Sequence, residues 1–361
     1  MLGFGGWAVG GRGWGRSTDQ AERVASVRRA FDRGIRFFDT APTYGVSEAL
    51  IGRALAGHRD EIVLATKVGP NDDVAASLAA SLRRLGTDRV DVLQLHEVGE
   101  RFEDSLQAMA RLREAGKAPH LGLSNATPPQ IQRAVEVAGI EGYQGHYNLF
   151  DRDVEQRILP LCRDRGVAFL AYRPLAAGLL SGGFGPKPPS FPEGDHRDGI
   201  YWFRGAEYDR RQRVIGRLRQ LAESRGTSLP ALALAWVLSR PGVRVVLAGA
   251  RTPEQVDQNV AAMENPLQRD EIGEIDREVA EVFRPPAVTG RARELAGEWG
   301  QRERFIVERL DGSTSYDGIA AEWSDQEATP MTSAQVKVFA DQLVERGLAT
   351  DEQHSEQTKS R

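Results

Sequence analysis

Cysteine is almost missing from this sequence: its 361 residues include only Cys162. One cysteine cannot form an intrachain disulfide or a cysteine-rich metal site, and its amphipathic surroundings are typical of a buried, small apolar side chain. Long hydrophobic runs are also missing, since the most apolar run, 229–238, is too short to span a bilayer. The start of the chain has no basic segment followed by an apolar stretch. We therefore expect a cytoplasmic protein with no membrane contact.

An excess of charge of one sign is absent too. The 47 Lys and Arg residues are nearly balanced by 51 Asp and Glu residues, which leaves a formal net charge of −4 at pH 7. Binding to nucleic acid or to an anionic membrane depends on concentrated positive charge. We therefore do not expect either as a partner held by bulk electrostatics.

Short β-branched or aromatic runs alternate with longer amphipathic runs, many of which end at glycine. This alternation predicts a parallel sheet in an α/β protein. The eight predicted strands are 2–9, 35–39, 62–67, 90–96, 120–124, 143–146, 167–172 and 243–248. Eight strand–helix pairs favour a closed barrel, because an open sheet would leave two long edges to protect. The prediction is a (β/α)8 TIM barrel over residues 1–287.

A compositional break follows Pro285 and Pro286, and residues 288–361 are predicted to form a small, mainly helical module with a disordered end. Its predicted helices are 302–310, 315–323 and 333–346, in an order that resembles a winged-helix module. From residue 290 onward it has nine basic and fourteen acidic side chains, which opposes DNA binding. Two roles stay open: a cap that stabilises the barrel or a dimer, and a docking module for a protein or peptide partner.

Polar residues follow one another at the ends of three consecutive predicted strands. These are Asp39, Lys67 and His96, and Tyr44 comes shortly after Asp39. Barrel active sites are built at the carboxyl ends of the strands. The four residue types suit carbonyl reduction, in which the oxygen must receive a proton as hydride reaches the carbon. We expect Lys67 to lower the pKa of the Tyr44 phenol, Asp39 to orient Lys67, and His96 to polarise the carbonyl.

At these residues the sequence resembles the aldo-keto reductase superfamily. The resemblance covers residues 2–283, and its motifs occur in family order: FFDTAPTYG, LATKVG, LQLHE, LGLSNA, YQGHYN, AYRPLAAGLLSG and LAGARTPEQVDQNVAA. It implies a TIM barrel that binds a nicotinamide cofactor without a Rossmann domain and reversibly reduces an aldehyde or ketone with NADPH. It also implies Asp39, Tyr44, Lys67 and His96 as the catalytic residues, with Tyr44 as the proton donor.

The same motifs imply the cofactor contacts. Ser124, Asn125 and Gln144 would hold the nicotinamide carboxamide, while Tyr172 would stack on the nicotinamide ring. The residues that match the adenosine-phosphate segment are Gly249, Arg251, Gln255 and Asn259. Arg251 favours NADP(H) over NAD(H), because a planar guanidinium suits a 2′-phosphate. The Lys-Ser pair of the best-studied branch is missing there, so the preference depends mainly on this arginine.

The substrate wall is less marked in the sequence. Trp7 and the aromatic run Tyr201, Trp202 and Phe203 in the long irregular segment 181–205 are candidates, although the run would equally anchor its own loop by burial. Arg173 follows the stacking tyrosine, where many family members have a small residue. No metal is expected, because the histidines His58, His120 and His146 lack the spacing of a metal site.

Two function classes remain at this point. The first is an NADPH-dependent reductase of a small carbonyl substrate. The alternative is a nucleotide-sensing regulatory or docking protein whose C-terminal module binds a protein or peptide. His96 favours the enzyme, because the regulatory relatives carry another residue at that position.

Overall fold

The computed structural model describes residues 1–11, 13–14, 19–283, 287–288, 301–310, 316, 318–320, 323, 331–345 and 348–350. The chain divides into two compact units, Met1–Ile275 and Asp276–Arg361. The division falls within helix α10 (Arg269–Phe283), upstream of the boundary predicted at residue 287.

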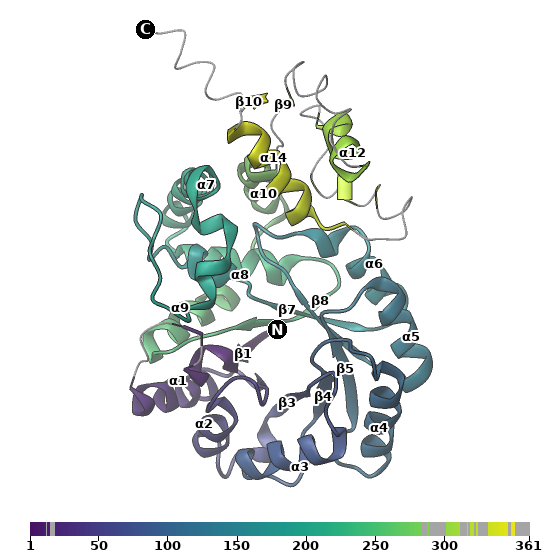
Figure 1. Cartoon of the computed structure of the whole chain (residues 1–361). Helices are drawn as coiled ribbons and strands as arrows, with labels where there is room; N and C mark the ends of the chain where they lie inside the picture. Colours follow the sequence, from purple (N-terminus) through teal and green to yellow (C-terminus); the bar gives the residue numbers. More distant parts are fainter. Residues whose placement is uncertain are drawn as a thin grey trace, which may run out of the picture. The chain divides into compact units, whose positions relative to one another are not determined.

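The first unit is a closed barrel of eight parallel strands in sequence order, with helices around it (Figure 1). The strands are β1 Leu2–Gly5, β2 Phe37–Asp39, β3 Val63–Val68, β4 Val92–Leu95, β5 His120–Ser124, β6 Gly142–His146, β7 Ala168–Tyr172 and β8 Val243–Ala248. The barrel closes where Leu2 of β1 pairs with Val246 of β8. The predicted TIM barrel is confirmed.

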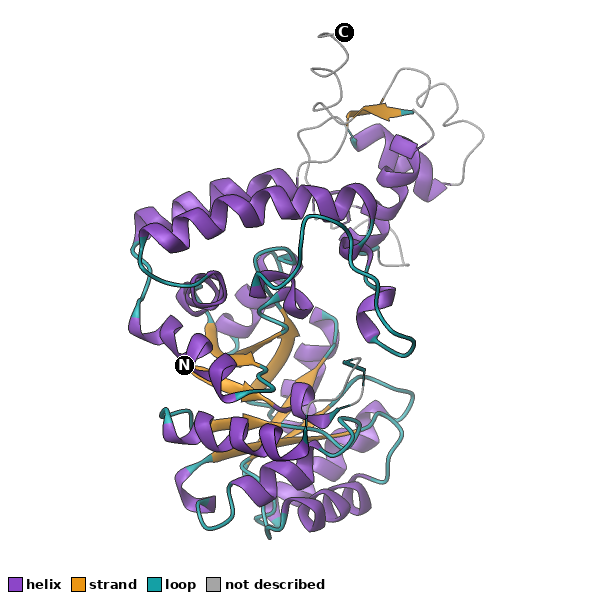
Figure 2. Ribbon diagram, turned by 90° about the vertical axis from the view of Figure 1, so that its left-hand side faces the viewer, coloured by secondary structure: helices purple, strands orange, loops and turns teal. Residues whose placement is uncertain are grey.

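The α-helices surround the strands, as the view turned by 90° also shows (Figure 2). They are α1 Gln20–Asp32, α2 Ser47–Ala54, α3 Val74–Leu85, α4 Phe102–Glu114, α5 Pro128–Ala138, α6 Ile158–Asp164, α7 Gly205–Ser224, α8 Leu229–Ser239, α9 Pro253–Glu264 and the part of α10 that belongs to this unit. Helix α1 shows why these segments pack on the barrel: Val24, Val27 and Ala30 recur at helical spacing and are all buried.

Short 3₁₀ helices occupy several connections. They are η1 Gly6–Gly10, η2 Arg59–Glu61, η3 Asp153–Glu155, η4 Ala176–Ser181, η5 His196–Gly199 and η6 Tyr201–Phe203. Helix η1 replaces the second half of the strand predicted over 2–9. Glycine is required at its end, because a Cβ on Gly10 would overlap the carbonyl of Tyr44. The Val46 amide also donates to the Gly10 carbonyl at 3.3 Å, so η1 packs directly on the loop that carries Tyr44.

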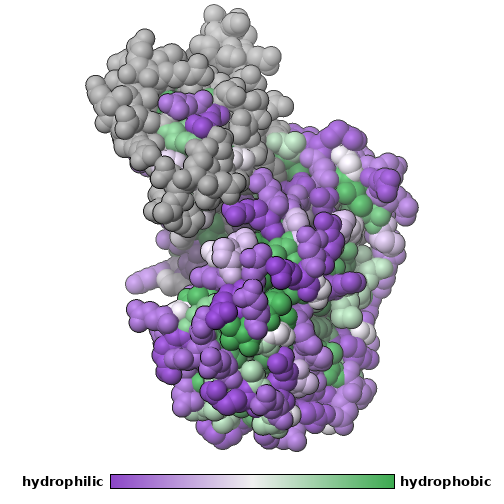
Figure 3. All heavy atoms as spheres, turned by 90° about the vertical axis from the view of Figure 1, so that its right-hand side faces the viewer, coloured by the Kyte–Doolittle hydropathy of each residue, from purple (hydrophilic) through white to green (hydrophobic). Residues whose placement is uncertain are grey.

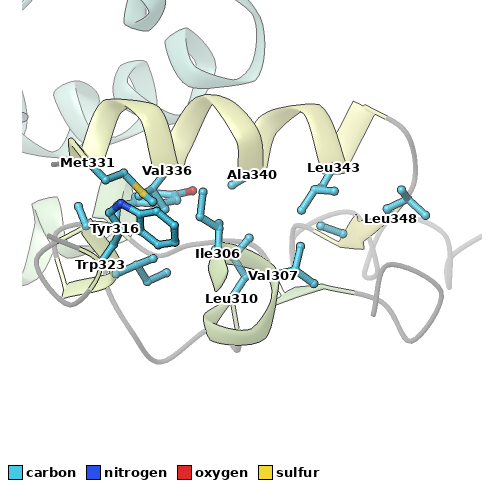
Figure 4. Packing of buried hydrophobic residues seen from close by; sticks show 13 residues of the cluster. Ile306, Val307, Leu310, Tyr316, Trp323, Met331, Val336, Ala340, Leu343 and Leu348 are labelled. Atoms are coloured by element: carbon cyan, nitrogen blue, oxygen red, sulfur yellow. The ribbon is translucent and has the colours of Figure 1, made fainter. Parts of the chain in front are cut away.

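The second unit contains helices α12 (Gln301–Arg309) and α14 (Ser333–Glu345) and the antiparallel strands β9 (Ala287–Val288) and β10 (Ala349–Thr350). Val336, Ala340 and Leu343 of α14 face Ile306 and Leu310 in one buried apolar cluster (Figure 4). Helices α12 and α14 correspond to the first and third predicted helices, and the described residues of the second, 316, 318–320 and 323, are helical. The winged-helix resemblance and the cap and docking roles stay predictions.

Hydrophilic side chains cover much of the described surface in the opposite side view, with smaller apolar areas between them (Figure 3). Within the described part of the chain, every helix is too short or too polar to cross a membrane.

Candidate active site

A buried ion pair joins two neighbouring strands. Lys67 Nζ on β3 lies 2.8 Å and 2.6 Å from the two carboxylate oxygens of Asp39, the last residue of β2. The ammonium also donates to the Thr40 carbonyl at 3.0 Å. Burial by itself lowers the pKa of Lys67, but the charge of Asp39, the interaction with Tyr44 and the hydrogen bonds to both residues together outweigh burial and raise the pKa. Lys67 therefore keeps its charge at neutral pH although its side chain is fully buried.

Two buried glutamines complete the hydrogen bonding of Asp39. Gln94 on β4 and Gln144 on β6 each donate to its Oδ1, at 3.0 Å and 2.9 Å. Gln144, which is predicted to help hold the nicotinamide carboxamide, thus directs its amide to Asp39. Gln94 is not among the site residues predicted from the sequence. Its signal is a polar residue inside an apolar strand, two positions before His96 and so on the same face. Asp39, Lys67, Gln94 and Gln144 are called the polar floor below.

Tyr44 lies beside this ion pair, in the loop between β2 and α2. The centroid of its ring is 4.9 Å from Lys67 Nζ. The ring of His96, which directly follows β4, packs against Tyr44 edge-on, with 5.6 Å between the centroids and 80° between the planes. The structure thus brings together the four residues predicted to be catalytic.

Burial shifts the pKa of both rings. It raises the pKa of the Tyr44 phenol, and the positive charge of Lys67 acts in the opposite direction without cancelling the rise. The expected net lowering is therefore wrong, although the effect assigned to Lys67 is present. Burial, with a smaller contribution from Lys67, lowers the pKa of His96 to about 4, so the imidazole is neutral at pH 7.

The residues predicted to contact the nicotinamide lie together at the ends of β5, β6 and β7. The Tyr172 hydroxyl donates to Asn125 Oδ1 at 2.9 Å, and the Asn125 amide donates to the His96 carbonyl at 3.1 Å. Ser124 Oγ donates to the Gln144 carbonyl at 3.0 Å. Asn125 has a φ of 52°, in the left-handed region that asparagine adopts more readily than most residues. Hydrogen bonds thus link the predicted stacking ring to the segment of His96.

A cavity of about 550 Å³ lies at the carboxyl ends of the strands. This volume is in the range typical of cofactor and small-molecule sites. Its lining includes Trp7, Asp39, Tyr44, Gln144, Tyr172, Gly249, Arg251, Gln255 and Asn259. The cavity therefore connects the proposed proton donor to all four residues predicted for the adenosine phosphate.

The phosphate segment is held by its own side chains at the start of α9. Gln255 Oε1 accepts a hydrogen bond from the Arg251 amide at 2.8 Å, and Thr252 Oγ1 accepts one from the Gln255 amide at 3.4 Å. The Asn259 amide donates to the Gly249 carbonyl at 3.3 Å. Arg251 lines the cavity, and burial lowers the pKa of its guanidinium.

The aromatic run 201–203 lies outside the lining of the cavity, unlike Trp7. Trp202 and Phe203 are buried, and Phe203 packs against Phe184 with 5.2 Å between the ring centroids. Tyr201 packs edge-on against Trp202 at 5.4 Å. Among the described residues that line the cavity, Trp7 and Phe184 are present and the run 201–203 is not. The run is therefore placed as a loop anchor that supports the cavity through Phe184.

Residues that the sequence analysis did not assign to the site complete the wall of the cavity. Trp14 packs edge-on against Trp7 at 5.2 Å, and the Arg197 guanidinium lies 5.5 Å from the Trp14 ring. Arg197 is paired with Asp195 at 2.6 Å. Trp7, Trp14, Arg173 and Arg197, which all line the cavity, are called the loop wall below.

The three histidines examined as metal ligands in the sequence are each bonded to a carboxylate. The pairs are His58 with Glu61, His120 with Glu141, and His146 with Asp151, at 2.7, 2.6 and 2.7 Å. Within the described ranges, groups of three or more His, Cys, Asp or Glu placed to hold a metal ion are absent.

Comparison with known proteins gives similar curated relatives. "Aldo-keto reductase YhdN" of Bacillus subtilis (strain 168) is 34% identical over 275 residues, which are 71% of this chain and 82% of the relative. The "NADH-specific methylglyoxal reductase" of Escherichia coli (strain K12) is 32% identical over 316 residues, or 78% of this chain and 95% of the relative.

Solved structures agree with these relatives. The glycerol dehydrogenase AKR11B4 from Gluconobacter oxydans has a TM-score of 0.70 at 32% identity, over 77% of this chain and 91% of that chain. An aldo-keto reductase from Klebsiella pneumoniae in complex with NADPH has a TM-score of 0.62 at 29% identity, over 76% of this chain and 89% of that chain. A family model described as "Aldo/keto reductase family" matches residues 1–280. The chain belongs to the aldo/keto reductase family.

Proposed function

We propose that this chain reversibly reduces an aldehyde or ketone to the alcohol, with NADPH as the hydride source and Tyr44 as the proton donor. The observation that carries the proposal is the position of Tyr44, which lines the cavity while the Lys67–Asp39 ion pair lies beside its ring. The names of the similar proteins, a methylglyoxal reductase and a glycerol dehydrogenase, support carbonyl reduction and its reverse.

The residues of the cavity fit a nicotinamide dinucleotide. Tyr172 presents an aromatic ring beside the predicted carboxamide residues, and the start of α9, where the helix dipole is positive, lies in the segment predicted to bind the adenosine phosphate. Arg251 adds positive charge at the start of that helix. When bound, a reduced nicotinamide supplies the hydride.

Tyr44 is suited to donate the proton. Its raised pKa keeps the phenol protonated at neutral pH. As the carbonyl carbon receives hydride, the oxygen becomes an alkoxide-like base stronger than a phenolate, and Tyr44 Oη transfers its proton to that oxygen. The charged Lys67 then stabilises the phenolate that remains, and Asp39 holds Lys67 in place.

His96 has a separate task in this mechanism. Its imidazole is neutral at pH 7, so one ring nitrogen carries a proton that can form a hydrogen bond to the carbonyl oxygen. Such a bond orients the carbonyl toward Tyr44 and polarises it as negative charge develops on the oxygen. The proton that is transferred comes from Tyr44.

The preference for NADPH over NADH depends on Arg251 and not on family membership. The K. pneumoniae enzyme is described in complex with NADPH, whereas the E. coli relative is described as NADH-specific. A guanidinium at the start of α9 favours a ligand with an additional phosphate.

Tyr44→Phe tests the proposal, because it removes one hydroxyl and leaves the ring. We expect carbonyl-dependent NADPH oxidation to fall by about 10² to 10⁴-fold, the usual contribution of a general acid, while the Kd for NADPH is unchanged. Tyr316→Phe, the same change in the second unit, is the matched control. Near-normal turnover by Tyr44→Phe would contradict the assignment.

A further inference from the structure

Arg173 places a positive charge in the wall of the catalytic cavity. It directly follows Tyr172 at the end of β7, and it lines the cavity together with Trp7 and Tyr44. Its guanidinium carbon lies 5.0 Å from the centroid of the Trp7 ring, whose own centroid is 6.2 Å from that of Tyr44. The charge therefore lies on the catalytic side of the cavity.

The guanidinium has hydrogen-bonding capacity that the described residues do not use. Its Nε is buried and has no hydrogen-bond partner. Across the described ranges, a carboxylate within ion-pair distance of Arg173 is absent, and Asp151, whose charge acts on it, is bonded to His146 at 2.7 Å. A cation withdrawn from water without a direct counterion is unfavourable. An anionic ligand in the cavity would remove this imbalance.

The backbone supports the same conclusion. Arg173 has a φ of 52°, in the left-handed region that is unfavourable for a residue other than glycine. The Asn148 amide holds this conformation by donating to the Arg173 carbonyl at 3.2 Å. Glycine would adopt it without strain, and strained residues cluster at functional sites. A long cationic side chain at this position indicates a role in the cavity.

The other two arginines that line the cavity are placed differently. Arg197 is paired with Asp195 at 2.6 Å, and Arg251 lies at the start of α9, where it is proposed to bind a cofactor phosphate. Arg173 alone of the three lies against Trp7, which also neighbours Tyr44. An anion bound to Arg173 would therefore lie close to Trp7 and Tyr44.

We propose that Arg173 binds a carboxylate of the substrate, so that the enzyme acts on small carbonyl compounds that carry an acid group, such as oxo acids and semialdehydes. The inference rests on the proposed function. A guanidinium pairs with a carboxylate through two parallel hydrogen bonds. Because Trp7 contacts both Arg173 and Tyr44, the carboxylate and the carbonyl are separated by a few bonds, and the apolar part between them packs on the indole.

The test compares acids with their methyl esters. Succinic semialdehyde and 4-formylbenzoic acid are each assayed against their own ester with the wild type, Arg173→Gln and Arg173→Lys. We expect the wild type to prefer the acids, and we expect Arg173→Gln to reduce the acid-to-ester ratio of kcat/KM by about 10- to 100-fold, mainly through KM, as for a lost charge-assisted contact. Arg173→Lys should restore part of the ratio, because it keeps the charge.

Arg36→Gln is the matched control, since it removes the same charge from an exposed arginine at the other end of β2 and should leave the ratio unchanged. An equal ratio in the wild type and Arg173→Gln would overturn the inference. So would a loss of NADPH affinity with an unchanged ratio, which would assign Arg173 to the cofactor. If the wild type reduces both esters without preferring the acids, only the inference fails. If it reduces neither acids nor esters, the proposed function fails with it.

Discussion

The polar floor and the loop wall of the cavity are built in opposite ways. The floor residues Asp39, Lys67, Gln94 and Gln144 come from four barrel strands and are bonded to one another. The wall and its surroundings come from connecting segments and contain buried polar atoms without a partner: Trp14 Nε1, Arg173 Nε and His196 Nε2. The difference indicates that the chemistry depends on rigid, satisfied groups and that recognition depends on groups left open for a ligand.

Lys67→Met should produce the largest effect, because it breaks the floor itself. It leaves the carboxylate of Asp39 buried without its cation, which we expect to lower the free energy of unfolding by about 3–5 kcal/mol. We also expect kcat to fall by about 10² to 10⁴-fold, and residual activity to move to higher pH as the cation that favours the Tyr44 phenolate is lost. Urea denaturation and steady-state kinetics measure the two effects.

Lys117→Met is the matched control, because Lys117 is an exposed lysine outside the cavity. If Lys67→Met had the stability and turnover of the wild type, the polar floor would not be needed for either, and its contrast with the loop wall would fail.

His96 should make the free energy of unfolding depend on pH. Its pKa is about 4 in the folded protein, against about 6.5 for an unperturbed histidine. The unfolded chain therefore binds the proton more tightly, and the free energy of unfolding should fall as the pH drops from about 6.5 to about 4, by roughly 3 kcal/mol in total. Urea denaturation of the wild type and His96→Asn across this range measures the contribution, which the variant should lack.

If the free energy of unfolding of the wild type and of His96→Asn depended on pH in the same way, His96 would not be held neutral by its surroundings.

Arg251→Ala should produce the smallest of these effects, one confined to binding. NADPH should bind about 10- to 100-fold more weakly, or 1.5 to 3 kcal/mol, as for a lost charge-assisted contact, while NADH is little affected because it lacks the 2′-phosphate. Fluorescence titration with both nucleotides measures the two Kd values. Equal weakening of NADPH and NADH would place the phosphate contact elsewhere.

The barrel and the positions of the catalytic residues could be predicted because both depend on local patterns. Strands β5 and β8 begin and end where the alternation of apolar runs places them. Parallel strands bring their carboxyl ends to one face, so Asp39, Lys67 and His96 must meet there. The first strand was predicted four residues too long, because the apolar pattern continues through Trp7 while η1 turns away from the sheet.

The cavity wall was harder to predict. The run 201–203 has the composition of a substrate wall, yet Trp202 and Phe203 are buried in the loop, whereas Trp14 lines the cavity. An aromatic residue that contacts a ligand and one that anchors a loop look the same in the sequence. The choice between these places depends on how connecting segments fold over the barrel, which periodicity does not encode.

The sequence by itself determined the order of the strands and helices, the choice of the proposed catalytic side chains and the strand ends that carry them, because these follow from spacing along the chain. The tertiary structure alone decided the protonation of the site: burial raises the pKa of Tyr44 and lowers that of His96, and the charge of Lys67 opposes the first shift and adds to the second. It also decided that Gln94 bonds to Asp39 and that Arg173 has no described counterion. Desolvation and charge interactions depend on distances between residues far apart in the sequence, and only the closed barrel sets those distances.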